Sequence, residues 1–361
     1  MRILMVSPTL FEPPKRVGGG ERYVEELAAA LSRRPEVAKV KVLGFSGGRY
    51  DRVISPKLSV HSYDALHHNG NPFNPYFSPR AFSHNDWDVL YLHQFHTWLT
   101  PAAIAWAKLL GRKIVLTDHN GGGATLNRKL RLDRQLDALL ATSRISAEDL
   151  ALRPKRTEII YGGVDTDAFA PPAGETAREG FLFVGRALRI KGLEELLAAA
   201  GQARRAARLT LLLWADGSTR EYVRKLRALW QELEPKSKMT VRFVTEAGKS
   251  ELLRNYQSHD WTVLPSRDEF PRECLGLTAL EGLSCGTAAA VSRFTGASEL
   301  ASAYPSPAFQ VVEDWTRFFE TAAGGRDLFR AARAWALEHA SWDAVARNVV
   351  RVFEELAGAK R

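Results

Sequence analysis

Cysteine is scarce in this sequence of 361 residues, which contains only Cys274 and Cys285. Two cysteines exclude a disulfide-rich scaffold, and this pair does not have the spacing of a metal site. No run approaches the roughly 20 apolar residues that a membrane-spanning helix needs. The first eight residues are typical of a strand rather than a signal peptide. We therefore expect a cytoplasmic protein with reduced thiols and no membrane span.

The sequence also lacks a long block of one charge. Its 50 Lys and Arg against 41 Asp and Glu give a formal net charge of +9, but the two signs are interleaved nearly everywhere. The densest basic cluster is 128–134, RKLRLDR, which a solvated helix face would also explain. No zinc-finger spacing or aromatic RNA-binding signature is present, so we expect no nucleic-acid partner. A phosphorylated small molecule and an anionic membrane surface remain as polyanionic partners.

Short apolar runs alternate regularly with helical patterns. In the first half, strands are predicted at 3–6, 40–45, 89–92, 114–117, 139–142 and 158–161, and helices at 21–31 and 104–110. A break at 170–174, APPAG, predicts a linker. Strands then follow at 181–184, 209–213, 241–244, 261–264 and 288–291, with helices at 193–203, 221–233 and 277–283. The tail from 315 to 355 is predicted to be helical, with a break near Ser341. Strands separated by helices imply mostly parallel sheets.

This order predicts an α/β protein with two doubly wound, Rossmann-like domains. We place the first domain at 1–172 and the second at 173–341, and we assign a final helix at 342–361 to the first. Two such domains are expected to bind a ligand between their facing strand ends. The segment 67–87 does not fit, because a loop of about 20 residues is unusual in a compact domain. Its aromatic residues either serve a function or cap the core.

Two glutamates, Glu273 and Glu281, are separated by seven residues in the segment 273–286, ECLGLTALEGLSCG. A strand is predicted to end at Leu264 and a helix to begin near Leu275. Glu273 is then expected at the N-terminus of this helix, and Glu281 about two turns inside it. Carboxylates placed in this way can accept hydrogen bonds from sugar hydroxyls, and the free N–H groups of the helix can bind phosphate. Either glutamate alone is typical of a surface helix, but the pair with its two glycines predicts a binding site.

Two cations follow another predicted strand end. Arg186 and Lys191 stand five positions apart in the segment 183–193, FVGRALRIKGL. Cations at the carboxyl end of a strand, beside a glycine that allows close backbone approach, suit a diphosphate leaving group. A solvated basic loop is the commoner meaning of such a run. The diphosphate interpretation gains weight because the Glu273 loop also lies at a strand end of the same domain.

Weaker signals lie in the first domain. Gly18 and Gly19 belong to a glycine run that lacks the dinucleotide fingerprint, and His119 follows a strand in 117–123, TDHNGGG. By itself the glycine run is a weak signal of a phosphate loop. A lone histidine is more often structural than catalytic, but its position at the rim of the proposed ligand site favours a role there. His93 and His96 could suggest zinc, but no third ligand accompanies them, and core or rim histidines explain them better.

In combination, these motifs resemble glycosyltransferase family 4, a group of retaining enzymes with the GT-B fold. The resemblance covers nearly the whole chain and implies two facing Rossmann-like domains, with the last helix crossing back to the first. It implies transfer of a sugar from a nucleoside-diphosphate sugar to an acceptor hydroxyl, with retention of anomeric configuration. The matched segments are the glycine loop with Glu21, His119, 160–169, 183–192, 265–266 and 273–286.

The resemblance also implies a role for each matched residue. Arg186 and Lys191 would neutralise the diphosphate, while Glu281 would bind the ribose and Glu273 the hydroxyls of the donor sugar. His119 would lie beside the reacting sugar. Backbone groups of the remaining matched positions would hold sugar or phosphate: Gly18, Gly19, Leu275, Gly276 and Leu277.

The sequence departs from the family pattern in three places. A glycine-containing turn is replaced by 214–217, WADG, and a usual glycine is replaced by 245–246, TE. The loop 267–272 is longer than usual, which makes Glu269 a rival for the first glutamate. The spacing to Glu281 favours Glu273.

We expect neither a cofactor nor a metal. In this family the acceptor proton is thought to pass to the departing diphosphate, so no dedicated base is assigned. Asp165 and Asp167 look like a metal-binding pair, but they fall in a segment that is already matched. Among the alternatives, an oxidoreductase would need the missing glycine fingerprint, and a phosphorylase would need a pyridoxal lysine motif. A non-catalytic carbohydrate- or membrane-binding module of the same fold is disfavoured by the complete set of charged site residues.

The sequence constrains the acceptor least, and it names neither the nucleotide nor the sugar. Up to Pro172 the chain has 23 Lys and Arg against 17 Asp and Glu, whereas the remainder has 27 against 24. This surplus and the aromatic segment 73–87 favour a peripheral enzyme at the inner face of an anionic membrane, acting on a lipid-linked or cell-envelope glycan. A soluble small-molecule acceptor would leave the same surface solvated.

Overall fold

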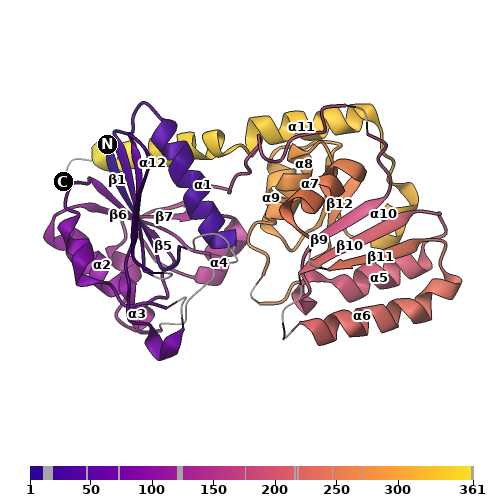
Figure 1. Cartoon of the computed structure of the whole chain (residues 1–361), viewed down its shortest axis with the longest axis horizontal. Helices are drawn as coiled ribbons and strands as arrows, with labels where there is room; N and C mark the ends of the chain where they lie inside the picture. Colours follow the sequence, from indigo (N-terminus) through magenta and orange to yellow (C-terminus); the bar gives the residue numbers. More distant parts are fainter. Residues whose placement is uncertain are drawn as a thin grey trace. The chain divides into compact units, whose positions relative to one another are not determined.

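The computed structural model describes residues 1–10, 19–45, 48–71, 74–119, 125–174, 176–214, 217, 219–245, 247–270 and 272–358. The chain divides into two compact units, which Figure 1 shows with their helices and strands labelled. Unit 1 consists of Met1–Gly163 with Trp342–Arg361, and unit 2 consists of Val164–Ser341. In the described part of the chain, no helix has the length and apolar character that crossing a membrane requires.

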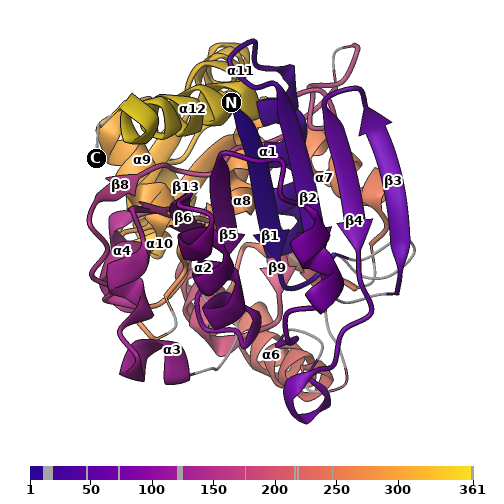
Figure 2. The same ribbon diagram turned by 90° about the vertical axis from the view of Figure 1, so that its left-hand side faces the viewer.

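Unit 1 is built on an eight-stranded sheet in the order β3-β4-β2-β1-β5-β6-β7-β8. All neighbouring strands are parallel except β3 and β4, which form an antiparallel pair at one edge (Figure 2). The strands are β1 (Arg2–Ser7), β2 (Lys39–Gly44), β3 (Tyr50–Ser55), β4 (Leu58–Ser62), β5 (Val89–His93), β6 (Lys113–Thr117), β7 (Ala138–Ala141) and β8 (Thr157–Ile159).

Helices cover both faces of this sheet, so its central strands are apolar on both sides. Along β1, Ile3 and Met5 face one hydrophobic core, and Leu4 and Val6 face the other. The first core contains α1 (Gly19–Arg33) and α12 (Trp342–Gly358), and the second contains α2 (Leu99–Leu109). The shorter helices of the unit are α3 (Leu126–Lys129) and α4 (Arg144–Leu150).

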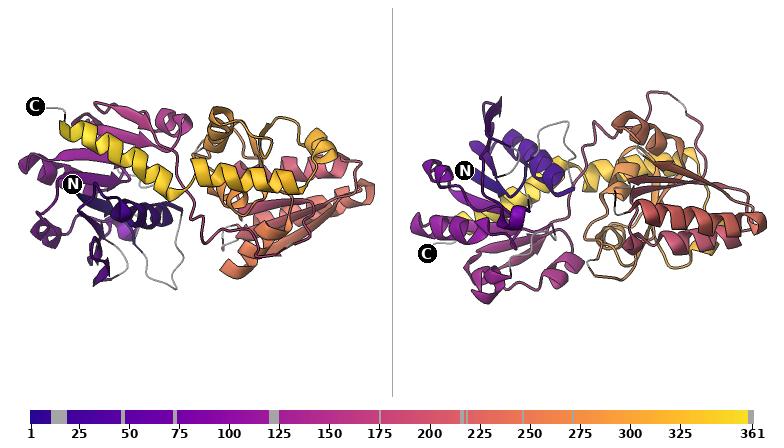
Figure 3. Two further views of the ribbon diagram at one scale, coloured as in Figure 1. Left: turned by 90° about the horizontal axis from the view of Figure 1, so that it is seen from above. Right: turned by 60° about the horizontal axis from the view of Figure 1, so that its bottom comes forward.

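The last helix of the chain, α12, packs on the first unit (Figure 3). Its first residue, Trp342, donates a hydrogen bond from Nε1 to Glu26 on α1. Asp343 pairs with Arg33 at 2.9 Å. At Gly163, a Cβ atom would lie 2.9 Å from the Trp342 ring, so a larger residue there would displace the start of the helix. These contacts explain why the C-terminal helix packs in the same unit as the first sheet.

The edge pair β3 and β4 has no counterpart among the strands predicted from the sequence. β3 is exposed along most of its length, and Val53 and Ile54 are 81% and 52% exposed. An edge strand that faces solvent does not need the apolar pattern from which buried strands are recognised. Its position is fixed by backbone pairing to β4.

The aromatic segment that the sequence leaves between two interpretations packs inside unit 1. The Phe77 ring lies 5.1 Å from Phe45 and 5.7 Å from Trp106, measured between centroids. Trp87 is fully buried and lies 5.1 Å from Trp106. Two short 3-10 turns, His68–Gly70 and Pro79–Ser83, give the segment secondary structure. The aromatic side chains in the described part of this segment thus mainly extend the core, although Tyr76 and Phe82 stay 40% exposed.

Unit 2 has a six-stranded parallel sheet in the order β11-β10-β9-β12-β13-β14. Its strands are β9 (Phe181–Arg186), β10 (Arg208–Trp214), β11 (Thr240–Thr245), β12 (Trp261–Leu264), β13 (Ala288–Ser292) and β14 (Phe309–Val312). Its helices are α5 (Leu193–Gln202), α6 (Arg220–Leu233), α7 (Lys249–Ser258), α8 (Leu277–Ser284), α9 (Gly296–Ala303), α10 (Trp315–Thr321) and α11 (Arg326–His339). Between β9 and β12 the strand order changes direction, which is where doubly wound sheets bind ligands.

The boundary between the units lies at Gly163, ahead of the linker that the sequence predicts at 170–174. Residues after Gly163 are fastened to unit 2. The backbone N–H of Val164 donates to Ala340 at 2.8 Å, and Ser284 Oγ donates to the Phe169 carbonyl at 2.6 Å. Gln257 donates to the Ala170 carbonyl at 2.8 Å. The stretch rich in Pro and Gly is therefore a surface segment of unit 2.

A buried histidine in unit 2 predicts a defined loss of stability in acid. His259 is 3% exposed, and its two ring nitrogens contact the Asn255 carbonyl at 2.7 Å and Thr210 Oγ1 at 2.9 Å. Burial lowers its pKa to about 4. The unfolded chain, with a histidine pKa of about 6.5, binds more protons between these values. The stabilising contribution is therefore complete above pH 6.5 and is lost as the pH falls toward 4.

We expect the melting temperature of the His259→Gln variant to lie below that of the natural protein at pH 7.5. The difference should shrink as the pH falls from 6.5 to 4, because only the natural protein loses the contribution of His259. Thermal unfolding of both proteins at matched ionic strength measures this convergence. A difference that stays constant over the whole range would contradict the assignment.

Candidate functional site

The end of β9 presents two cations on a loop whose path depends on a glycine. Arg186 is the exposed last residue of the strand, and its guanidinium has no ion-pair or hydrogen-bond partner among the described residues. A 3-10 turn at Arg189–Lys191 then brings Lys191 toward the neighbouring strand. Gly192 follows at φ +67°, where a Cβ atom would lie 2.0 Å from the Pro265 carbonyl oxygen. Only glycine fits this close approach, which places the loop against the end of β12.

Lys191 meets Glu273 directly, although 82 positions separate them in sequence. The Lys191 ammonium forms an ion pair with the Glu273 carboxylate, and both side chains are 17% exposed. The backbone of Glu273 is held by Gly296, whose N–H donates to the Glu273 carbonyl at 2.9 Å. The structure thus brings together one predicted cation and one predicted carboxylate at the switch point of the sheet.

The helix that follows Glu273 begins with a second required glycine. Gly276 precedes α8 at φ +83°, and a Cβ atom there would lie 2.5 Å from the Leu264 side chain. The helix begins at Leu277, as in the predicted range 277–283 and two residues after the start near Leu275 that was used to place the glutamates, while Leu275 is buried. The Leu275–Leu277 backbone therefore passes close to the end of β12.

Glu281 lies inside α8 and is 3% exposed. Its carboxylate accepts a hydrogen bond from Tyr256 Oη on α7 at 2.7 Å. A buried carboxylate needs such partners, because desolvation without them costs several kcal/mol. Glu281 thus belongs to the same helix as the Gly276 turn, but its environment is drier than that of Glu273.

Arg267, at the start of the long loop before Glu273, is hydrogen-bonded to the loop that carries Lys191 and to the helix that follows it. Arg267 donates from Nε to Glu195 at 2.6 Å and lies 3.2 Å from Glu269. Its backbone N–H donates to the Ile190 carbonyl at 2.8 Å. Glu269, the rival for the first glutamate, is therefore paired with Arg267, while Glu273 is paired with Lys191.

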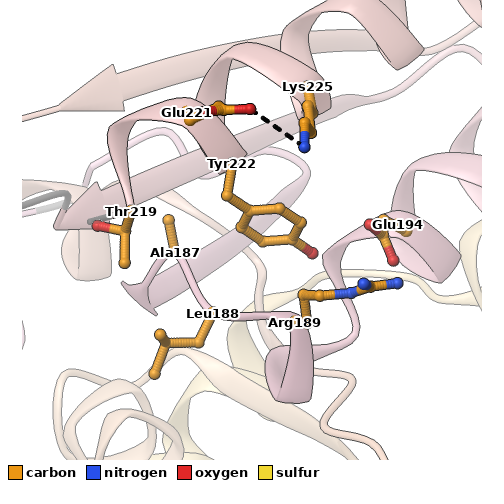
Figure 4. A pocket seen from close by; sticks show the side chains of 8 residues that line it. All are labelled: Ala187, Leu188, Arg189, Glu194, Thr219, Glu221, Tyr222 and Lys225. Carbon is orange, nitrogen blue, oxygen red and sulfur yellow. Dashed lines mark ion pairs between the residues drawn. The ribbon is translucent and has the colours of Figure 1, made fainter. Parts of the chain in front are cut away.

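An open pocket of about 570 Å³ lies beside this site, between the loop after β9 and the start of α6. Figure 4 shows the Tyr222 ring lying across it, with its hydroxyl directed toward the side of Arg189 and Glu194. Glu221 and Lys225 form an ion pair of 3.2 Å at its edge. The pocket thus has balanced charge, and Arg189 is two residues from Lys191. Its lining is Ala187, Leu188, Arg189, Glu194, Thr219, Glu221, Tyr222 and Lys225.

In unit 1, the polar side chains collect at the carboxyl ends of β5 and β6. His119 Nε2 lies 3.4 Å from His93 Nδ1, and its ring centroid lies 4.7 Å from that of Tyr23 on α1. A Cβ atom at Gly20 would lie 3.4 Å from the His119 side chain. Burial lowers the pKa of His119 to about 4, so the ring is neutral at pH 7. Of the predicted glycine pair, Gly19 begins α1, whereas Gly18 lies outside the described residues.

Gln94 has a strained backbone next to these histidines. Its φ is +80°, a conformation that costs a residue other than glycine of order 1–3 kcal/mol. The backbone is held there because Gln94 N–H donates to the Thr117 carbonyl at 3.0 Å and Thr100 donates to the Gln94 carbonyl at 3.3 Å. The side-chain oxygen is buried and has no partner among the described residues. Strain and an unpaired amide oxygen together mark Gln94 as a candidate ligand-binding residue.

We expect Gln94→Gly to unfold at a higher temperature than Gln94→Ala, by about 1 kcal/mol in free energy, because only glycine relieves the positive φ. Both variants remove the same amide, so both should lower activity to a similar extent. Thermal unfolding and a transfer assay on the two variants test this. A less stable glycine variant would contradict the strain assignment.

Several candidate site residues carry no signal in the sequence. Tyr256 is 25 positions from Glu281, and nothing in its neighbourhood indicates a contact. Gln94 is an ordinary residue type at a position where only its backbone angle is unusual. His93 is visible in the sequence, but only as half of a metal pair with His96. Among the described residues, no three His, Cys, Asp or Glu side chains are grouped to hold a metal ion.

Two family models match the chain, one in each half. The model described as Glycosyltransferase Family 4 matches residues 17–168, and the model described as Glycosyl transferases group 1 matches residues 178–318. The two matched ranges cover the glycine loop, His119, the cation loop and the Glu273–Glu281 segment.

The curated relatives carry the name D-inositol 3-phosphate glycosyltransferase. The protein of Salinispora arenicola is 26% identical over 306 residues, which are 76% of this chain and 65% of that protein. The protein of Mycobacterium sp. (strain KMS) is 30% identical over 166 residues, which are 42% of this chain and 36% of that protein. The matches thus span between about a third and two thirds of these relatives' length.

Solved structures of the same fold match over nearly the whole chain. Sucrose-phosphate synthase from Thermosynechococcus elongatus has a TM-score of 0.70 and 20% identity, covering 99% of this chain and 100% of that chain. Anabaena HepE, solved in complex with UDP and glucose, has a TM-score of 0.68 and 16% identity, covering 98% and 100%. The fold is therefore GT-B, with two Rossmann-like parallel-sheet domains, which confirms the predicted class. Because the two family models together match most of the chain, the chain belongs to family 4 of the glycosyltransferases.

Proposed function

We propose that the protein transfers a sugar from a nucleoside-diphosphate sugar to an acceptor hydroxyl and retains the anomeric configuration. The observation that carries the proposal is the Lys191–Glu273 ion pair at the switch point of the unit 2 sheet, with Lys191 on the loop that follows Arg186 at the end of β9. The same place combines cations for a diphosphate with a carboxylate for sugar hydroxyls. The match to family models of glycosyltransferases over both halves supports this chemistry.

The donor binds to unit 2 in this proposal. Arg186 and Lys191 face the diphosphate, and the backbone N–H groups at Gly276 and Leu277 add donors to it. Glu281 accepts from the ribose hydroxyls, and Glu273 accepts from the donor sugar after Lys191 has exchanged its carboxylate for phosphate. The Anabaena protein of the same fold was solved with UDP and glucose, which supports a nucleoside diphosphate as the class of donor.

The reaction breaks the bond between the anomeric carbon and the diphosphate oxygen and forms a bond from that carbon to the acceptor oxygen. The acceptor proton passes to the departing diphosphate, so no side chain needs to act as a base. Cations aimed at the developing negative charge lower the barrier, each by about 3 kcal/mol. His119 is neutral at pH 7 and is proposed to orient the sugar through a hydrogen bond.

Two acceptor classes follow from different observations. A lipid-linked or cell-envelope glycan at the inner face of a membrane is suggested by the basic surplus of unit 1. Against it, the aromatic side chains Phe77 and Trp87 of the segment that would contact lipid are packed in the core. A soluble phosphorylated polyol is suggested by relatives named for inositol 3-phosphate. Because these aromatic side chains are packed in the core, we favour the soluble phosphorylated polyol as the acceptor.

The donor proposal is tested by thermal shift with free UDP, GDP, ADP and TDP, followed by a hydrolysis assay with the matching sugar nucleotides. One nucleotide at 100 times its dissociation constant should add about 2.7 kcal/mol to the free energy of unfolding. The configuration of the product, read by NMR at the anomeric proton, tests retention. If none of the four nucleotides stabilises the protein, the donor site is assigned to the wrong chemistry.

We propose that the reaction needs no metal, so turnover should survive a strong chelator. If a chelator inhibits the reaction and added Mg²⁺ or Mn²⁺ restores it, the proposal is wrong, and Asp165 and Asp167 become candidate metal ligands. The acceptor classes are separated by two arms, inositol phosphate as acceptor in solution and co-sedimentation with vesicles of anionic lipid at low and high salt. A protein that stays in the supernatant at low salt has no membrane surface of this kind.

A further inference from the structure

His93 and His119, which lie at the carboxyl ends of neighbouring strands in unit 1, are related by their ring geometry and not merely by proximity. His93 is the last residue of β5 and is 1% exposed, and His119 follows the neighbouring strand β6. Their ring planes differ by only 3°. The centroids are 5.7 Å apart while Nδ1 of His93 and Nε2 of His119 are 3.4 Å apart. The difference is about the sum of two ring radii, so the rings are close to coplanar and the two nitrogens point at each other.

At 3.4 Å the contact is a long hydrogen bond, beyond the usual range of about 2.7–3.2 Å for an N–H donor, but the two nitrogens are aligned for it. Burial lowers the pKa of His93 well below its usual value, and burial also lowers that of His119. Each neutral imidazole carries one proton and one lone pair. When the hydrogen bond forms, one of the two facing nitrogens has the proton and the other accepts it. The tautomer of one ring then fixes the tautomer of the other. Nε2 of His93 is buried without a hydrogen-bond partner among the described residues, which favours the proton on Nδ1, where it is donated to His119 Nε2.

Neighbouring aromatic rings hold both histidines in place. The Tyr91 ring lies 4.4 Å from that of His93 on the same strand, and the Tyr23 ring lies 4.7 Å from that of His119. Tyr91 Oη is itself hydrogen-bonded to Thr117 Oγ1 at 2.7 Å. Among the described residues, none forms a hydrogen bond with the second ring nitrogen of His119, Nδ1.

We propose that His93 is a positioning residue that occupies Nε2 of His119 and locks one tautomer of that ring, leaving Nδ1 as the nitrogen that contacts a substrate oxygen. The inference rests on the proposed function only for the identity of that oxygen, which would belong to the transferred sugar or its acceptor. The coupling between the two rings is already present in the protein without ligand, so it can be measured without any substrate.

The test is ¹⁵N NMR of the histidine rings in full-length protein labelled at histidine, at pH 7.5 and without ligand. In the natural protein, the His119 nitrogens should show one protonated and one unprotonated signal, as a single tautomer does. His93→Phe removes the facing nitrogen but keeps an aromatic ring, so the His119 signals should move toward the average of two tautomers. His93→Asn places an amide near the position of Nδ1 and should restore the single tautomer.

His84→Phe is the matched control, because His84 is a half-buried histidine of the same unit that contacts Tyr63 and His61 instead. It should leave the His119 signals unchanged. Should His93→Phe fail to fold, His119→Phe reports the same contact from the other side through a change in the His93 signals. The proposal is overturned if the signals of the remaining ring are unchanged in the folded variant.

Kinetics then separate positioning from structure. His93→Phe should lower kcat for transfer about 10- to 100-fold with KM for the donor nearly constant, as expected when a reacting group is misplaced, and His93→Asn should recover most of the loss. A change in the ring signals without any transferase activity in the natural protein would refute the proposed function and leave the coupling intact. Unchanged signals in a protein that is an active transferase would refute the coupling alone.

Discussion

Replacing Lys191 by alanine should lower turnover about 100-fold or more, because it removes a cation worth about 3 kcal/mol in the transition state. Arg186→Ala should lower turnover to a similar extent. The two variants should differ in stability. Arg186 is exposed and has no partner among the described residues, so its removal should leave the melting temperature unchanged. Removal of Lys191 leaves Glu273 without its counterion, so a lower melting temperature is expected.

Arg189→Ala is the matched control for these variants. Arg189 is a cation on the same turn, two residues before Lys191, but it lines the neighbouring pocket. Replacing Arg189 changes the net charge by the same amount. Because salt screens electrostatic interactions over long distances, this variant should lower turnover less than about 3-fold. Steady-state turnover of the three variants at saturating donor makes the comparison. Equal losses in all three would show that total charge, and not the position of Lys191 and Arg186, controls the reaction.

Glu281→Gln should weaken binding of the free nucleoside diphosphate by about 1–3 kcal/mol, through loss of charge-assisted hydrogen bonds to ribose. The corresponding increase in Kd is about 5- to 150-fold. Glutamine keeps the shape of the side chain and can still accept from Tyr256, so the helix should remain folded. Isothermal titration with the nucleotide that gives the largest thermal shift measures the effect.

Two further variants show whether this loss is specific. Tyr256→Phe removes the hydrogen bond to Glu281 but leaves the carboxylate, so it should weaken nucleotide binding less than Glu281→Gln does. Glu273→Gln should not weaken binding of the free nucleotide at all, because it removes a competitor for Lys191, but it should impair use of the sugar nucleotide. Equal losses of free nucleotide in Glu281→Gln and Glu273→Gln would contradict the separate roles.

The elements that the sequence predicts well are those buried on both faces. β1 and β9 are apolar runs because two helical layers cover each of them, and their glycine-marked loops follow directly. Glu273 and Lys191 could be assigned to one site because both follow strands that end at the same edge of the sheet. Their direct ion pair could not be predicted, because it depends on the close approach of Gly192 to Pro265.

Other features depend on contacts that leave no local trace. β3 is held by pairing to β4 and is exposed along most of its length, Val53 and Ile54 included, so its pattern is not that of a buried strand. The division of the chain at Gly163 follows from the hydrogen bonds of Val164 and Phe169, whereas the Pro- and Gly-rich stretch that suggests a linker lies later. The positive φ of Gln94 and the coplanarity of His93 and His119 are properties of three-dimensional packing alone.

The ion pair between Lys191 and Glu273 has a consequence for which anions the site admits. A phosphate or chloride ion from solution must displace a carboxylate that the chain itself keeps at a high effective concentration. A simple anion offers nothing to the displaced Glu273, whereas a diphosphate with a sugar attached gives that carboxylate new hydroxyl partners. We therefore expect the resting protein to resist inhibition by common anions and to respond to a ligand that satisfies both side chains together.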